Sequence, residues 1–433
     1  MKRYAVEDKH LKSYTTTEKD LKKGNIRIPS NEYLIIELPS LAKMTNGSAE
    51  GNEIERSESK SIYIHNEEDK EVKLEDFNII KKIGKGGFGV VYLAEKIKDG
   101  TIYALKQLRK DMIIKRDAVI NAKLEKEILK LAKHQFLVGM KYVIQSPVNI
   151  FFIMKFYRGG ELYRHLKAKR RFDEEATKFY VAQIVLALGE LHKQNIVYRD
   201  MKPENILLDV DGYVALADFG LSKILSKDEN TKTFCGTPDY IAPEIIRNEE
   251  YNKQVDWWGV GILIYELMSG RAPFSHRNQL IMHKSIKTCD VPFPEPINST
   301  FSNDAKDIIK ALLCKDPANR LGAKGDAEEV LAHPFFSKID IPKLLNKELK
   351  PPFKPPVNEK DKYDLQNFAS MPGPIINIDV VDPQSMETIE KNKVIITLTH
   401  RQSLIALYNL SSCPISYVPL FNALSIVCFN IIL

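Results

Sequence analysis

The sequence predicts an α+β protein with two lobes, a small β-rich lobe followed by a larger α-helical one. Apolar, β-branched runs at 78–80 and 90–93 flank a group of glycines and predict a strand, a loop and a second strand. A further strand is predicted to end at Lys106, and apolar residues at helical spacing surround Glu125 in a stretch without Pro or Gly. The length of 433 residues exceeds one typical core, which favours two lobes with extensions.

The composition is typical of a soluble globular protein and argues against several other classes. Hydrophobic residues make up 44% of the chain and charged residues 28%, as in a soluble globular protein. The net charge of +6 is mild, and the short basic run at 167–171 is interpreted as a solvated helix end, so no nucleic acid is expected as a partner. The five cysteines contain no CxxC pair and predict neither a disulfide framework nor a zinc site. The first residues lack the apolar segment of a signal peptide, and we expect a cytoplasmic protein.

The glycine-rich segment Gly84-Lys85-Gly86-Gly87-Phe88-Gly89 lies between the first two predicted strands. Three fixed glycines are a weak signal alone, because glycine is a common residue. A strand follows these glycines, whereas a Rossmann dinucleotide site requires a helix there. The segment therefore argues against a dinucleotide site of the Rossmann type.

Two polar motifs near the middle of the chain predict a phosphoryl-transfer site. The segment 198–205 contains Asp200, Lys202 and Asn205, and Asp218-Phe219-Gly220 follows it closely. In-line transfer from ATP needs an Asp that accepts the proton of the attacking hydroxyl, which suits Asp200. It also needs oxygen ligands for Mg²⁺, which suits Asn205 and Asp218. In this order the two motifs resemble the catalytic and metal-binding loops of eukaryotic protein kinases.

The resemblance to protein kinases is continuous over residues 77–336. It includes Ala242-Pro243-Glu244, Asp256-Trp257-Trp258-Gly259 and the motif at 316–322, all in family order. It implies the two-lobed kinase fold, with a β-rich N-lobe at 77–156 and a larger helical C-lobe at 157–336. By the same resemblance, Glu244 and Arg320 form a buried ion pair.

The resemblance also implies the roles of individual residues around ATP. Lys202 neutralises charge on the transferred phosphoryl group, Lys106 holds the α- and β-phosphates, and Glu125 holds Lys106 in place. Met154 is the gatekeeper beside the adenine, which the backbone groups of Lys155 and Tyr157 bind; relatives usually carry Glu at position 155, and we expect little consequence of the change. The implied ATP-binding residues are Ile83, Gly84, Gly86, Gly89, Val91, Ala104, Lys106, Glu125, Met154, Lys155, Tyr157 and Leu207.

Further residues indicate the subgroup. Lys202 and Gly236-Thr237-Pro238-Asp239-Tyr240 resemble serine/threonine kinases. Tyr198, the segment 233–238 and the Pro-rich segment 349–356 are similar to the AGC group, and most of all to protein kinase B and ribosomal S6 kinase. This similarity implies that an upstream activating kinase phosphorylates Thr233 and that Arg199 and Lys223 bind the phosphate. Asn121, on the helix that bears Glu125, occupies a position where the family often has a histidine. Asparagine carries no charge, so we expect weaker coupling between the loop that carries Thr233 and this helix.

The same subgroup implies protein substrates with arginine before the phosphorylated residue, in Arg-x-x-Ser/Thr segments. The implied substrate-binding residues are Glu161, Glu204, Thr237 and Glu266, and the three carboxylates suit guanidinium groups. A kinase-fold scaffold without activity is the rival hypothesis. Such a scaffold usually lacks one of the catalytic residues, and none is missing here.

The segments outside the kinase-like region are harder to interpret. Residues 1–76 are expected to be mostly disordered, apart from a strand at 32–38. Residues 337–375 resemble the AGC C-terminal segment, in which 363–368 would reach the adenine pocket. Residues 376–433 form a divergent tail whose last part, 402–433, contains no charged residue. Three interpretations stay open for that part: a membrane anchor or scaffold, a segment packed on the small lobe through Phe429 and Ile432, and an end unrelated to the family, which we favour.

Overall fold

The computed structural model describes residues 3–6, 14–17, 62–63, 72–86, 89–226, 229–371 and 383–391. The chain divides into two compact units, Met1–Glu58 and Ser59–Leu433. The described residues of the first unit form the antiparallel strands β1 (Arg3–Val6) and β2 (Tyr14–Thr17). The strand expected at 32–38 and the tail 402–433 lie outside the described residues, so the membrane and scaffold hypotheses for this tail stay predictions.

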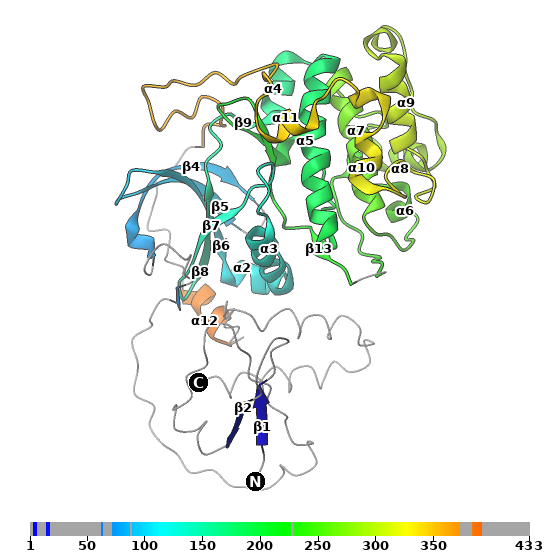
Figure 1. Ribbon diagram of the computed structural model, residues 1–433. Helices are drawn as coiled ribbons and strands as arrows, with labels where there is room; N and C mark the ends of the chain where they lie inside the picture. The colour runs from blue at the N-terminus through cyan, green and yellow to red at the C-terminus, as the bar shows by residue number, and fades with distance from the viewer. Residues whose placement is uncertain are drawn as a thin grey trace. The chain divides into compact units, whose positions relative to one another are not determined.

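The second unit begins with a small lobe built on an antiparallel sheet (Figure 1). Its strands lie in the order β3-β7-β8-β6-β5-β4. The glycine-rich segment connects β4 to β5, as the pattern of strand, loop and strand predicts. The strands are β3 (Ile62–Tyr63), β4 (Phe77–Lys85), β5 (Gly89–Lys96), β6 (Ile102–Arg109), β7 (Met140–Gln145) and β8 (Asn149–Lys155).

Two helices connect β6 to β7 and lie beside this sheet (Figure 1). They are α2 (Lys110–Lys115) and α3 (Val119–Leu131). The apolar residues of α3 recur at helical spacing, which buries Ile128 and Leu129 in the core. The same face carries Glu125, so burial of the apolar residues directs this carboxylate inward.

The larger lobe is mostly helical and surrounds one long central helix (Figure 1). That helix, α5, begins at the N-cap Asp173, whose side chain accepts a hydrogen bond from the backbone N–H of Ala176. The helix α7 is mostly apolar and almost entirely buried, and Gly270 ends it with a φ of 85°. The helices of this lobe are α4 (Leu162–Lys169), α5 (Glu174–Lys193), α6 (Pro243–Ile246), α7 (Gln254–Ser269), α8 (Gln279–Thr288), α9 (Asn303–Leu312), α10 (Asp326–Leu331) and α11 (Ile341–Leu345).

Short strands in this lobe hold the loops that carry the two polar motifs of the site. The segment 198–205 follows β10, and Asp218 follows β12. Asn205 directly precedes β11, and Asp218 closely follows β12. Because β11 and β12 pair antiparallel, with Ile206 opposite Leu216, Asn205 and Asp218 lie at the same end of this strand pair. The strands are β9 (Gly160–Glu161), β10 (Ile196–Val197), β11 (Ile206–Leu208), β12 (Val214–Leu216) and β13 (Lys223–Ile224).

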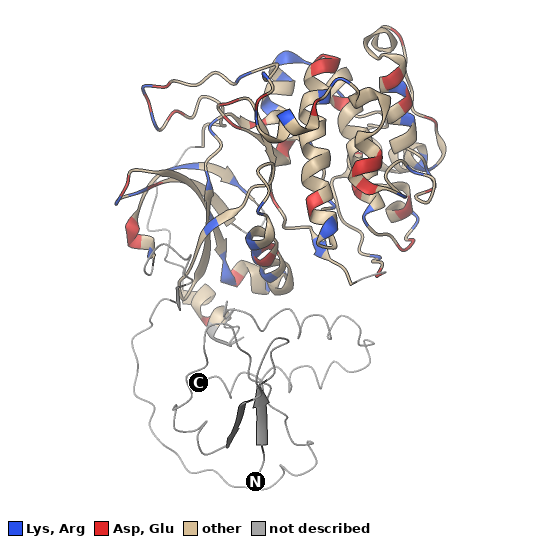
Figure 2. Cartoon of the chain, in the orientation of Figure 1, with Lys and Arg blue, Asp and Glu red and all other residues tan. Residues whose placement is uncertain are grey.

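The arrangement confirms the two-lobed α+β fold with a β-rich N-lobe and a larger helical C-lobe. Acidic and basic residues are interspersed along the described elements of both lobes (Figure 2). Within the described ranges, no helix has the length and apolar character needed to cross a bilayer.

The last described helix, α12 (Pro383–Lys391), packs against α2 of the small lobe. Ser385 is buried there, and its hydroxyl lies 3.0 Å from Oδ2 of Asp111. Arg109 donates to the same hydroxyl over 3.3 Å and forms an ion pair with Asp111. A polar contact within the described residues thus joins the C-terminal part of the chain to the N-lobe.

Candidate active site

A cavity of about 410 Å³ lies between the two lobes, a size typical of small-molecule sites. Every residue predicted to bind ATP lines this cavity. Apolar side chains from both lobes, including Val91, Ala104 and Leu207, line it together with Lys106 and several carboxylates. The structure therefore brings together residues that are far apart in the sequence.

Asp200 lines the cavity, and both of its carboxylate oxygens accept hydrogen bonds. Its Oδ1 accepts a hydrogen bond from the hydroxyl of Thr237 over 2.8 Å. Its Oδ2 accepts from Nζ of Lys202 over 2.6 Å and from Nδ2 of Asn205 over 2.9 Å. These partners fix the carboxylate in one orientation and hold a cation beside it.

Lys106 lies between two carboxylates from different lobes. Its Nζ is 2.5 Å from Oε1 of Glu125 on α3 and 2.9 Å from Oδ1 of Asp218. Burial opposes the charge on Lys106, but the two carboxylates outweigh it and raise the pKa of this amine. The Lys106 cation in turn lowers the pKa of Asp218. The lysine therefore stays charged and joins the small lobe to the loop after β12.

Asp218 itself has a φ of 55°, in the left-handed region that Asp tolerates better than most residues. Asn205 and Asp218 both line the cavity, and their oxygens are the hard ligands that Mg²⁺ prefers. Among the described residues, no group of three or more His, Cys, Asp or Glu side chains is arranged to hold a metal ion by itself. Because Mg²⁺ usually combines one or two side chains with phosphate oxygens and water, these two residues fit a Mg²⁺ that binds together with ATP.

The model of the protein kinase domain matches residues 77–336 of this chain. The chain belongs to the protein kinase family. It is 44% identical over 290 residues to RAC serine/threonine-protein kinase of Drosophila melanogaster, covering 66% of this chain and 47% of that protein. It is 47% identical over 299 residues to serine/threonine-protein kinase sck2 of Schizosaccharomyces pombe, covering 68% of this chain and 46% of that protein.

A probable serine/threonine-protein kinase of Dictyostelium discoideum is 40% identical over 359 residues, which cover 82% of this chain and 76% of that protein. The chain spans about half the length of the first two relatives. Together these similarities confirm the resemblance to AGC-group serine/threonine kinases of the protein kinase B type.

The hinge of this kinase-family chain has an unusual lysine side chain. The Nζ of Lys155 lies 2.5 Å from Oδ2 of Asp209 and 5.0 Å from the centre of the Tyr157 ring. Sequence reasoning assigned only the backbone of Lys155 to the site. The ion pair shows in addition that the lysine charge has a local partner in the C-lobe.

The C-terminal segment adds a side chain to the ATP pocket. Phe368 lines the cavity and stacks on Phe156 with ring centres 5.3 Å apart. The amide of Asn367 donates to the carbonyl of Arg158 over 3.1 Å, which ties this segment to the chain just after the hinge. The segment 363–368 thus reaches the pocket as expected. The local pattern alone does not select Phe368 within it.

Thr233, the predicted phosphosite, is exposed and lies near the two predicted phosphate-binding residues. Its hydroxyl is 3.3 Å from that of Thr231, which accepts a hydrogen bond from Lys223 over 3.2 Å. Arg199 donates to the hydroxyl of Tyr251 over 3.2 Å, and that hydroxyl donates to the carbonyl of Thr233 over 2.6 Å. Short chains of hydrogen bonds therefore connect both cations to Thr233.

The predicted substrate-binding carboxylates lie close to one another. Glu161 and Glu204 line the cavity, and burial followed by the charge of Glu204 raises the pKa of Glu161. Burial also raises the pKa of Glu266, whose Oε2 accepts a hydrogen bond from the hydroxyl of Tyr240 over 2.5 Å. Several like charges in a partly buried region favour a cationic ligand.

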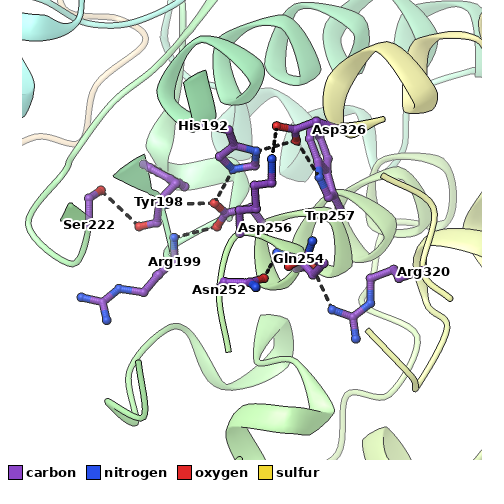
Figure 3. A network of polar contacts seen from close by, with 11 residues as sticks. His192, Tyr198, Arg199, Ser222, Asn252, Gln254, Asp256, Trp257, Arg320 and Asp326 are labelled. Carbon is purple, nitrogen blue, oxygen red and sulfur yellow. Dashed lines mark hydrogen bonds and ion pairs between the residues drawn. The ribbon is translucent and has the colours of Figure 1, made fainter. Parts of the chain in front are cut away.

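A buried polar network holds the loop that precedes Asp200 (Figure 3). Asp256 accepts hydrogen bonds over 2.8 Å from the backbone N–H groups of Tyr198 and Arg199. His192 and Asp326 complete this network. Sequence reasoning found Asp256 as part of a motif but assigned no role to His192 or Asp326, and no local signal identifies either of them.

A second buried pair lies beside this network. Arg320 binds Glu244 through two hydrogen bonds of 2.6 and 2.9 Å, as the resemblance implied. It also donates to the backbone carbonyls of Cys314 and Gln254. The guanidinium thereby connects the segment before α10 to the segments that begin α6 and α7.

Proposed function

We propose that the protein is a serine/threonine kinase that transfers the γ-phosphoryl group of MgATP to hydroxyl groups of proteins. The observation that carries this proposal is the arrangement around Asp200. Its carboxylate is oriented by Thr237 and Asn205, and it lies in the same cavity as Lys106 and Asp218. Relatives named serine/threonine-protein kinases, at 40–47% identity, support the same activity.

In this proposal each residue around Asp200 has a separate role in phosphoryl transfer. Asp200 accepts the proton of the attacking hydroxyl, and Lys202, 2.6 Å away, neutralises negative charge that develops beside it. Lys106 positions the phosphates, and its ion pair with Glu125 holds it in place. Bound MgATP supplies the phosphoryl group, with Asn205 and Asp218 as the side chains that would hold the metal.

We further propose that the substrates carry arginine before the phosphorylated residue. Glu161 and Glu204 line the same cavity as Asp200, and Glu266 lies near Glu204. A carboxylate binds a guanidinium group through two parallel hydrogen bonds, which lysine cannot form. Arg-x-x-Ser/Thr peptides should therefore react faster than their lysine counterparts.

We propose in addition that phosphorylation of Thr233 by an upstream kinase activates the enzyme. A phosphate there would bring about two negative charges to a loop that already lies beside Arg199 and Lys223. Because Arg199 immediately precedes Asp200 in the chain, an ion pair to the phosphate would order the catalytic loop.

A peptide-library assay on the full chain tests these proposals. The native chain should phosphorylate Ser and Thr peptides in the presence of MgATP, whereas Asp200→Asn should be inactive although folded. Glu161→Gln and Glu204→Gln should each reduce the preference for arginine, by roughly 30-fold if the contact is worth about 2 kcal/mol. Glu328→Gln, an exposed residue of α10, is the matched control and should leave the preference unchanged.

The pH dependence of peptide binding gives a second test. The raised pKa of Glu161 and of Glu266 means that each protonates at a higher pH than an ordinary glutamate. The KM for arginine peptides should therefore rise as the pH falls. Preference for acidic or proline-containing peptides would refute the proposed specificity but not the kinase activity.

A further inference from the structure

The side chain of His192, on α5, is fully buried between two carboxylates (Figure 3). Its Nε2 lies 2.9 Å from Oδ2 of Asp256, and its Nδ1 lies 2.8 Å from Oδ1 of Asp326. Both contacts are hydrogen bonds, and an ionised carboxylate can only accept. Both ring nitrogens must therefore donate, which only the imidazolium form of histidine can do.

The alternative, in which a carboxylate carries the proton, conflicts with the other partners of the two aspartates. Each oxygen of Asp256 also accepts a backbone N–H group, so both oxygens already act as acceptors for donors other than His192. Asp326 accepts from Nζ of Lys253 over 2.8 Å and from Nε1 of Trp257 over 3.0 Å. Burial opposes its charge, but His192 and Lys253 outweigh burial and lower the pKa of Asp326.

The charge on His192 follows from the same contacts. Burial alone would lower the pKa of the imidazole, but the hydrogen bonds and charges of Asp256 and Asp326 raise it. The charged groups that face His192 are these two aspartates, from α7 and α10, with Lys253 behind Asp326. The Trp257 ring packs edge-on, 5.1 Å from the imidazole centre.

Asp256 connects the His192 side chain to the loop that carries Asp200. The two N–H groups that it binds belong to Tyr198 and Arg199, directly before Asp200. Arg199 has a φ of 67°, a left-handed conformation that is strained for such a residue unless its surroundings hold it. The hydrogen bonds to Asp256 supply this restraint, and the His192 cation fixes Asp256 from the other side.

We propose that His192, held as an imidazolium by Asp326, is a positioning residue for phosphoryl transfer, since its charge anchors Asp256 and so fixes the backbone that carries Asp200. The proposal concerns how the site is held, and it rests on the proposed kinase activity. Neither His192 nor Asp326 lines the ATP cavity, so both act on kcat and leave the KM for ATP unchanged. Because the folded-state pKa of His192 is raised, its contribution is complete at low pH and is lost as the pH rises through that value.

The experiment compares the full native chain with Asp326→Asn and with Lys253→Met. Asp326→Asn keeps the shape but removes the charge beside Nδ1 of His192. The alkaline limb of its kcat profile should move at least about one pH unit lower, with the KM for ATP unchanged. Lys253→Met is the matched control: it removes another partner of Asp326 but leaves the contact with His192, so its alkaline limb should not move lower.

The histidine NMR resonances provide a readout that does not depend on activity. In the native chain at pH 7 the His192 ring should show the imidazolium signature, whereas an ordinary histidine, with a pKa of about 6.5, is mostly neutral there. A neutral His192 ring in the native chain, or an alkaline limb that Asp326→Asn leaves in place, would overturn the proposal. An imidazolium signature in a chain without kinase activity would instead refute the proposed function, while the network itself would stand.

Discussion

Replacement of Arg320 by methionine should destabilise the C-lobe strongly. The Arg320 guanidinium and the Glu244 carboxylate are 0% and 1% exposed, and their atoms are 2.6 Å apart. Removing one partner of such a buried pair leaves the other charge without compensation and typically costs about 3–5 kcal/mol. In a domain of 150–250 residues each kcal/mol lowers Tm by about 2–4 °C, so we expect a decrease on the order of 10 °C.

Thermal denaturation followed by circular dichroism measures this change. Lys232→Met is the control, because Lys232 pairs with Glu250 over 3.5 Å while both side chains are 59% exposed. Such a surface pair contributes at most about 1 kcal/mol. Combining Glu244→Gln with Arg320→Met should cost less than the sum of the single changes, since the double variant leaves no unpaired charge. A Tm for Arg320→Met no lower than that of Lys232→Met would refute the reasoning.

Three further changes test the active site. Lys106→Ala should lower kcat by more than about tenfold with a smaller effect on ATP binding, because its role is to position the phosphates; single-turnover kinetics would separate the two effects. Thr233→Ala should reduce activity, and phosphatase treatment of the native chain should reproduce the loss; full activity of the dephosphorylated chain would contradict the proposed switch. Phe368→Ala should raise the KM for ATP by up to about tenfold through loss of stacking on Phe156, with kcat nearly unchanged, and an unaltered KM would exclude a role in the pocket.

The cluster around Asp200 was predictable because its members lie in a short contiguous motif. Asp200, Lys202 and Asn205 are held by one loop, and the chemistry of phosphoryl transfer requires those residue types at that spacing. The strands around the glycines were predictable for a similar reason, since their apolar pattern reflects burial in one sheet. The resemblance then supplied the order of the two lobes.

Other parts of the site depend on contacts that no local pattern records. Val138 and Ala217 line the cavity, but in the sequence they cannot be distinguished from ordinary core residues. His192 and Asp326 meet only because α5 and α10 pack together in the folded lobe. The ion pair of Lys155 likewise depends on where the loop that follows β11 places Asp209.

The contact between α12 and α2 has a consequence for biosynthesis. Ser385 and Asp111 are 274 positions apart, and the ribosome makes the chain from its N-terminus at about 5–20 residues per second. The small lobe therefore emerges roughly tens of seconds before the helix that covers Asp111 exists. During that interval the Arg109–Asp111 pair faces solvent or other proteins in the cell, and the nascent small lobe reaches its final form only after translation has passed the end of the kinase domain.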